Sequence, residues 1–182
     1  MSNSISVNEV LKDIFANVNT WVHFAEAKNG AIIGINGLFL FKAIDYMIAM
    51  INGDMIGSVF LVAFISIMFI VALVISILSF FSNTKVFEDE ENADEGNTQD
   101  RILIFYGDIG KYKSSKNYLK DIHKQYLGST IDGDSLNKIE VDYAKEILIN
   151  SRIASRKYKL FNIALKINLL AIFLLSIFII IA

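Results

Sequence analysis

Cysteine and proline are both absent from the 182 residues of this chain. Without cysteine there is no disulfide, no thiolate nucleophile and no sulfur ligand for a metal. Without proline there is no proline kink in a helix. The sequence therefore has no proline signal for the broken spans that transporters use at their substrate sites. The helices of this chain can therefore run long.

Catalytic signatures are also missing. The two histidines, His23 and His123, form no HExxH motif, and the segment 107–111 has neither the spacing nor the hydroxyl of a P-loop. The segment 132–134, Asp-Gly-Asp, lacks the rest of an EF-hand loop and is typical of a turn. The sequence therefore predicts no enzyme, no metal and no cofactor.

Hydrophobic residues make up 54% of the chain, more than the roughly 45–50% of a soluble domain. They are concentrated in three blocks, at 31–51, 55–81 and 163–182. Each block is near the ~20 residues that a helix needs to cross the hydrocarbon core of a bilayer. The sequence predicts an all-α integral membrane protein with three transmembrane helices, the first two forming a hairpin and the third at the C-terminus.

Charge distribution predicts the orientation of these spans. Of the 17 Lys and Arg residues, 13 lie between Lys85 and Lys159, and the connection 52–54 has none. By the positive-inside rule, the N-terminus and the middle segment are cytoplasmic. Because residues 1–30 are polar and mixed in charge, we expect no cleavable signal peptide.

Outside the spans, three segments differ in character. Residues 1–30 predict an amphipathic helix, which would lie on the membrane surface or form one face of a cytoplasmic bundle. Residues 83–100 are rich in acidic side chains without apolar periodicity and predict an extended or disordered acidic linker. Residues 101–162 predict a cytoplasmic helical region.

Capping residues predict two helices in that region. Ser114 or Ser115 can cap a helix that continues through Tyr126. From Asn137, with Glu140 three residues later as a capping box, a helix can run without a breaker into the last span. Such a continuous helix would couple the soluble part to the membrane.

Polar and small residues interrupt the first span. Lys42 and Asp45 would each cost about 2.5–3.5 kcal/mol if they faced lipid unpaired, so we expect protein or water around them. Gly30, Gly34 and Gly37 form a small-residue stripe that permits close helix packing. The stripe and charges either line or register an oligomeric assembly, or belong to a static bundle with an intrahelical ion pair.

Two basic groups allow both a functional and a simpler interpretation. The group before the last span either binds a phosphate or fixes the topology and contacts anionic lipid. The second group is interleaved with tyrosines, which suits a nucleotide but also describes a solvated helix face. The first group consists of Arg152, Arg156, Lys157 and Lys159, and the second of Lys113, Lys116, Lys120 and Lys124 with Tyr112, Tyr118 and Tyr126.

Three short stretches, together with the two-plus-one arrangement of spans, resemble the transmembrane effectors of Pycsar, the pyrimidine cyclase system for antiphage resistance. The first stretch, 21–28, is similar to the family's stretch with an acidic residue and a lysine, although Glu26 replaces the usual Asp and Asn29 stands where a small residue is common. The second is 104–109, followed by Tyr118 and Leu119, and the third is 144–147 with 151–160. The resemblance covers most of the chain from Trp21 onward.

This resemblance implies an effector in the bacterial inner membrane. A functionally linked cyclase would make cyclic CMP or cyclic UMP, and this nucleotide would bind the cytoplasmic helices of the effector. The effector, which we expect to be a homo-oligomer, would then impair the membrane and cause abortive infection. We expect no nucleic acid as a partner. Residues in the resembling stretches are the candidates for ligand contact or coupling: Glu26, Lys28, Arg152, Arg156 and Lys157. Two alternatives stay open at this point, an effector of another nucleotide-signalled conflict system and a scaffold subunit without a ligand.

Overall fold

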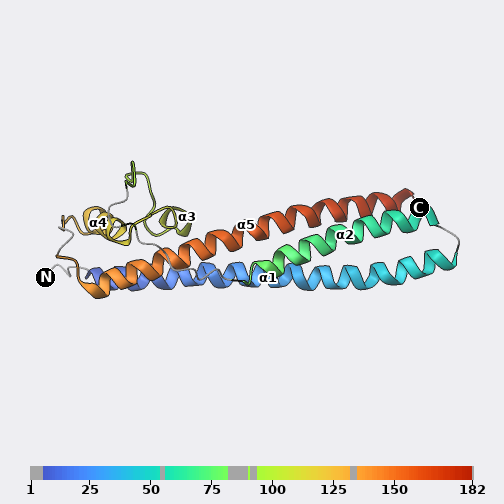
Figure 1. The fold of residues 1–182 in the computed structure, drawn as a ribbon, viewed down its shortest axis with the longest axis horizontal. Coiled ribbons are helices and arrows are strands. Elements are labelled where there is room, and N and C mark those ends of the chain that lie inside the picture. Colours follow the sequence, from blue (N-terminus) through green and yellow to red (C-terminus); the bar gives the residue numbers. More distant parts are fainter. Residues whose placement is uncertain (1–5, 54–55, 82–89, 91–93, 132–134, 182) are drawn as a thin grey trace. The chain divides into compact units, whose positions relative to one another are not determined.

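The computed structural model describes all residues except 1–5, 54–55, 82–89, 91–93, 132–134 and 182, and in the described part it contains five helices and no strand (Figure 1). In chain order the helices are α1 (Val7–Asn52), α2 (Ile56–Leu78), α3 (Tyr106–Ile109), α4 (Ser115–Tyr126) and α5 (Lys138–Ile181). The all-α prediction is confirmed. The predicted Asp132–Asp134 turn and most of the predicted acidic linker, including Glu88, lie outside the described residues.

Three of these helices, among the described residues, are long and apolar enough to cross a membrane: α1, α2 and α5. The first predicted block lies within α1, α2 forms residues 56–78 of the second, and α5 includes residues 163–181 of the third. Both α1 and α5 extend far beyond their blocks, whereas α2 is shorter than its block. The amphipathic segment and the first span form one uninterrupted helix, and the helix that follows Asn137 continues into the last span. The predicted continuous helix is therefore confirmed.

The chain divides into two compact units, and α1 and α5 contribute residues to both. Unit 1 comprises residues 1–24 and 82–156, and unit 2 comprises residues 25–81 and 157–182. In unit 1, the amide of Asn150 in α5 donates a hydrogen bond to Asn19 of α1, and in unit 2, Lys157 of α5 donates one to Glu26 of α1. The two residues of each pair are 131 positions apart in the sequence. In each unit, α1 and α5 are thus neighbours in the same register.

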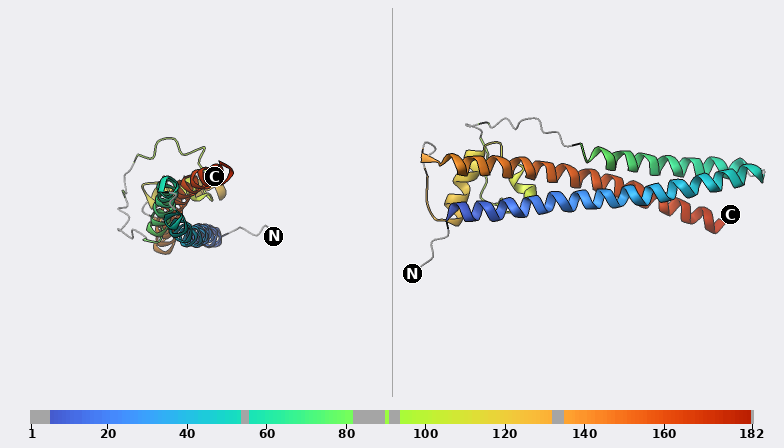
Figure 2. Two further views of the ribbon diagram at one scale, coloured as in Figure 1. Left: turned by 90° about the vertical axis from the view of Figure 1, so that its right-hand side faces the viewer. Right: turned by 90° about the horizontal axis from the view of Figure 1, so that it is seen from below.

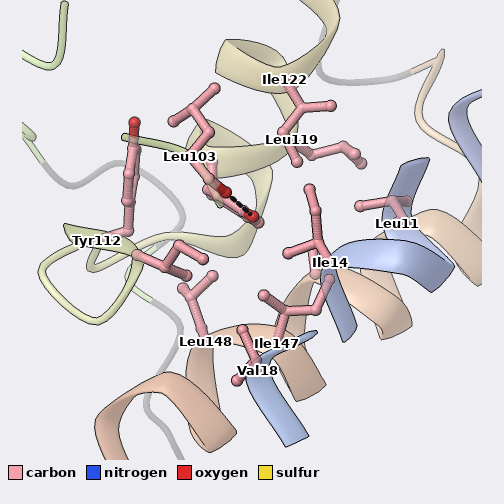
Figure 3. Packing of buried hydrophobic residues seen from close by; sticks show 12 residues of the cluster. Leu11, Ile14, Val18, Leu103, Tyr112, Leu119, Ile122, Ile147 and Leu148 are labelled. Carbon is pink, nitrogen blue, oxygen red and sulfur yellow. Dashed lines mark hydrogen bonds between the residues drawn. The ribbon is translucent and has the colours of Figure 1, made fainter. Parts of the chain in front are cut away.

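The core of unit 1 is formed by four helices and the loop before α3. Leu11, Ile14 and Val18 of α1 face Ile147 and Leu148 of α5, with α4 side chains closing the core (Figure 3). The apolar face formed by Leu11, Ile14 and Val18 is therefore buried in a helical bundle, which favours the bundle interpretation for this part of residues 1–30. The side of the membrane on which it lies stays a prediction. Ser114 caps α4 by accepting a hydrogen bond from the Asn117 amide at 3.3 Å, as predicted.

Two tyrosines in this core are fully buried. The Tyr118 hydroxyl donates to the Leu103 carbonyl at 2.8 Å, the bond dashed in Figure 3, and the Tyr112 hydroxyl donates to Asp121 at 2.6 Å. Burial raises the pKa of Tyr118 well above its ordinary value of 10.0. Burial, the hydrogen bond to Asp121 and the charge of Asp121 also raise the pKa of Tyr112. Both tyrosines are core residues rather than part of a nucleotide-stacking surface.

These buried phenols predict an alkaline limit to the stability of unit 1. Because the folded state raises the pKa of both groups, their contribution is complete below pH 10 and is lost as the pH rises further. In an alkaline titration of the full chain in detergent, Tyr112 and Tyr118 should ionise last, together with loss of structure. Absorbance at 295 nm and circular dichroism measure the two events, and smooth ionisation of all seven tyrosines near pH 10 would contradict the expectation.

Unit 2 is a bundle of three helix segments that lie side by side (Figure 2). One apolar cluster joins Ile32 of α1, Ala72 of α2 and Ala164 of α5. A second cluster joins Ile65 and Phe69 of α2 to Ala171 of α5, and the ring of Phe39 stacks on Phe69 at 4.8 Å. Small alanines at the contacts let the helices approach closely, as in many membrane bundles.

Candidate functional site

Arg152 of α5 fixes the loop that follows α3 in unit 1. Its Nε donates to the Gly110 carbonyl at 3.2 Å, and its Nη2 donates to the Tyr112 carbonyl at 2.6 Å. A Cβ atom at position 110 would lie 3.2 Å from the Tyr106 carbonyl oxygen and 3.5 Å from Cγ of Arg152, so the close approach favours glycine. The loop that directly follows residues 104–109 of the second resembling stretch therefore packs against Arg152 of the third.

Aromatic side chains join the first stretch to the second. The rings of Trp21 and Tyr106 lie 5.5 Å apart, and those of Phe105 and Tyr106 lie 4.7 Å apart. Nearby, Asn17 of α1 donates to the Ile104 carbonyl at 3.3 Å. Phe105 is 39% exposed, so this aromatic cluster of Trp21, Phe105 and Tyr106 reaches the surface of unit 1. All three resembling stretches thus contribute to one region of this unit.

Two acidic groups order the surrounding loops. Asp108 binds Nζ of Lys111 at 2.6 Å and accepts from the Ile102 amide at 3.2 Å. The Lys111 hydrogen bond is the main cause that lowers the pKa of Asp108, so the carboxylate is charged at neutral pH. Asp108 therefore connects the two ends of the segment 102–111 through its hydrogen bonds with Ile102 and Lys111.

Glu95 is the second of these acidic groups and was not predicted as a structural residue. Its carboxylate accepts from the amides of Lys113 and Ser114 at 2.8 and 2.9 Å and pairs with Arg101 at 3.2 Å. The guanidinium of Arg101 lies over the Tyr112 ring at 4.5 Å. Glu95 is 7% exposed, so this part of the acidic run packs on unit 1. No local pattern could reveal it, because its partners lie 18 and 19 residues away.

The remaining candidates of the three stretches lie in unit 2. The side chain of Lys157 is only 3% exposed, and its Nζ pairs with Glu26 at 2.9 Å and lies 5.4 Å from the Phe80 ring centroid. Lys28 lies over the rings of Tyr158 and Phe161, at 5.1 and 5.5 Å. These contacts link α1 to α5 and to the end of α2. Lys157 is thus a buried ion-pair partner rather than an exposed lipid contact.

The five predicted residues therefore divide between the units. Arg152 and Arg156 belong to unit 1, where Arg156 is exposed one turn after Arg152, whereas Glu26, Lys28 and Lys157 belong to unit 2.

Among the described residues, no group of three or more His, Cys, Asp or Glu side chains is arranged to hold a metal.

The polar and small residues of the first span face outward from the unit 2 bundle. A Cβ atom added at Gly30, Gly34 or Gly37 would meet nothing within 4 Å. Lys42 and Asp45 form an i,i+3 ion pair at 3.4 Å, with side chains 70% and 55% exposed. The predicted pairing of the two charges within the helix is present, and this face of α1 has no neighbour in the described chain at the glycines.

These features define an all-helical membrane protein that combines a bundle of apolar helices with a second unit that has its own core. A family model described as the Pycsar effector protein domain matches residues 10–182. The chain belongs to the Pycsar effector family, whose members are the effectors of an antiphage defence system rather than its cyclases. Comparisons with curated proteins and with solved structures found no match.

Proposed function

We propose that this protein is a membrane effector that binds a cyclic pyrimidine nucleotide and then impairs the bacterial inner membrane, which ends infection at the cost of the cell. The observation that carries this proposal is the family match, which runs through both units from residue 10 to residue 182. A functionally linked pyrimidine cyclase would supply cyclic CMP or cyclic UMP. In this scheme unit 1 is the sensor and unit 2 is the membrane-active part.

The aromatic cluster of unit 1 is the proposed place for the base. A pyrimidine ring can stack on Trp21 or Tyr106, and base stacking on an aromatic side chain contributes about 1–3 kcal/mol. Arg156 supplies the exposed positive charge for the cyclic phosphate, and Arg152 holds the loop in position through the Gly110 and Tyr112 carbonyls. A phosphate and a base would thereby be recognised by residues of all three stretches.

Glu26, Lys28 and Lys157 are proposed to couple nucleotide binding to the membrane. They join α1 to α5 in unit 2, and both helices also contribute to the core of unit 1. A nucleotide that binds one arrangement of α1 and α5 more tightly shifts the population toward that arrangement. The ion pair and the contact of Lys28 with aromatic rings would transmit the change within the bundle.

The outward face of α1 supports a homo-oligomer. An exposed ion pair in the middle of a span is costly against lipid, whereas a second copy would supply opposite charges to Lys42 and Asp45. The open surface at Gly30, Gly34 and Gly37 would let the backbones of two copies approach closely. Lipid would cover the remaining apolar surface, and the N-terminus and unit 1 would be cytoplasmic.

Binding of cyclic CMP and cyclic UMP to the full chain in detergent, measured by calorimetry, tests the proposed sensor. Trp21→Ala should weaken binding of the preferred nucleotide by about 5- to 150-fold, the equivalent of one stacked base. The matched control is Phe24→Ala, which removes an exposed aromatic ring of α1 and should bind normally.

In cells, depolarisation should follow only when an active cyclase, and not its inactive form, is expressed with the wild-type protein. Absence of binding for both nucleotides, together with no depolarisation at verified expression, would refute the proposed function. Equal binding by the wild type and Trp21→Ala would instead refute the stacking site.

A further inference from the structure

The interior of unit 2 contains two buried asparagines whose amides include atoms with no hydrogen-bond partner among the described residues. Asn36 of α1 is 0% exposed, and neither Nδ2 nor Oδ1 of its amide has a partner. Asn168 of α5 is 5% exposed, and its Oδ1 has none. In the hydrocarbon core of a bilayer an unsatisfied polar group is costly because no water is at hand to bond it. Polar groups that face the interior of a bundle of spans are candidates for a functional path.

The two asparagines lie at one level of the bundle. Asn36 is one helical turn from Ile32 on one side and from Leu40 on the other, and Asn168 is one turn from Ala164 and three residues before Ala171. Ile32 and Ala164 share one apolar cluster, while Leu40 and Ala171 share the next. The asparagines therefore form a polar layer between two apolar clusters.

More oxygen atoms without partners line the same interior on the side nearer Lys157. The Asn29 amide donates to the carbonyls of Ala25 and Lys157 at 2.9 and 3.4 Å, which leaves its Oδ1 buried without a partner. Ser76 of α2, one turn beyond Ala72, is 0% exposed, and its Oγ also has no partner. Carbonyl oxygens replace the hydration shell of K⁺ in selective pores, and the side-chain oxygen of an asparagine is an amide carbonyl of the same kind.

A purely structural role would give a different geometry. Asparagines that set the register of paired helices bond to each other across the interface. Neither amide atom of Asn36 makes such a bond, so Asn168 does not satisfy it. A polar layer whose members do not satisfy one another is suited to water, which can donate to and accept from several groups at once.

We propose that Asn29, Asn36, Ser76 and Asn168 form a hydrated polar track inside the part of the spans nearer Lys157, and that small monovalent cations pass along this track when the effector is active. This inference rests on the proposed function, because it names the route by which the membrane would lose its potential.

The absence of cysteine makes the hydration of the track directly measurable. In membrane vesicles that contain the full-length protein, Asn36→Cys is treated with a small cationic methanethiosulfonate, whose sulfenyl group the thiolate captures with release of methanesulfinate. Ile32→Cys, equally buried one turn away, is the matched control. A hydrated thiol keeps a pKa lower than a thiol in apolar surroundings, and one pKa unit changes the thiolate fraction about tenfold. Asn36→Cys should therefore react at least about tenfold faster than Ile32→Cys, and equal rates would overturn the track.

Potassium flux into proteoliposomes tests the permeation step separately. Asn36→Leu with Asn168→Leu should keep nucleotide binding within about twofold of wild type, because both residues lie outside the proposed sensor. The double variant should lower nucleotide-triggered flux about tenfold, the equivalent of about 1.4 kcal/mol in the barrier, because it removes the polar groups that would hold water in the span. Ile32→Leu should retain both properties. Wild-type flux that persists in the double variant would overturn the track. A wild type that binds no nucleotide and conducts nothing would instead overturn the proposed function, while the thiol reaction still decides whether the layer is hydrated.

Discussion

Glu26→Ala is expected to lower the free energy of unfolding of unit 2 by about 3 kcal/mol, the lower end of the range for breaking a buried ion pair. The reason is that Lys157, 3% exposed, would lose the carboxylate at 2.9 Å that compensates its charge. Glu26 itself is 37% exposed, which places the value at the low end because solvent screens the pair. In a chain of this length, 3 kcal/mol corresponds to about 6–12 °C in the midpoint of thermal unfolding, measured by circular dichroism in detergent.

A double variant separates the charge from the packing. Glu26→Leu with Lys157→Met removes both charges and retains most of the apolar volume, and such replacements of buried pairs are commonly neutral or stabilising. We expect its midpoint to lie close to that of wild type, although the contact of Lys157 with the Phe80 ring is lost. If Glu26→Ala and the double variant lost the same stability, the ion pair would not be what holds α1 to α5 in this region.

The same comparison bears on coupling. If Glu26 and Lys157 transmit nucleotide binding, the double variant should fold and bind nucleotide but depolarise cells less than wild type. If the pair only stabilises unit 2, depolarisation should return together with the thermal midpoint.

Local patterns predicted the elements of this fold because their causes are local. Apolar runs of sufficient length predicted the three spans, and Ser114 predicted the start of α4 because an N-cap acts on an amide three residues away. The absence of a breaker after Asn137 predicted the single helix α5. Its cap is also local, since the Ile139 amide donates to Oδ1 of Asn137 at 3.1 Å.

Tertiary contacts in the candidate site could not be predicted in the same way. Trp21 meets Tyr106 across 85 positions of the chain, and Glu95 binds amides near the start of α4 although charge alone predicted a solvated linker. The interleaved tyrosines suited a nucleotide as well as a solvated helix face, and only the packing of unit 1 shows that Tyr112 and Tyr118 are instead buried in the core. Similarly, Asn36 has no periodic signal that distinguishes the bundle interior from its surface.

Arg152→Ala is expected to loosen the loop 102–112 in unit 1 and, through it, the proposed sensor. The substitution removes two charge-assisted hydrogen bonds, to the carbonyls of Gly110 and Tyr112, and each such bond contributes about 1.5–3 kcal/mol. Arg152→Lys should restore little, because an ammonium group cannot reproduce the planar fork that reaches both carbonyls. Amide hydrogen exchange of the full chain, measured by mass spectrometry without nucleotide, should be at least tenfold faster in this loop, the equivalent of about 1.4 kcal/mol.

Arg156→Ala is the matched control, since Arg156 is an exposed arginine one turn later on the same helix. It should leave exchange in the loop unchanged and weaken nucleotide binding, whereas Arg152→Ala should change both. If exchange in the loop were unchanged in Arg152→Ala, the hydrogen bonds of Asp108 and Glu95 would be sufficient to hold the loop, and the Arg152 guanidinium would not be needed. Because exchange is measured without nucleotide, faster exchange in Arg152→Ala reports a less stable loop. A loss of nucleotide binding in Arg156→Ala with unchanged exchange reports a lost contact with the ligand.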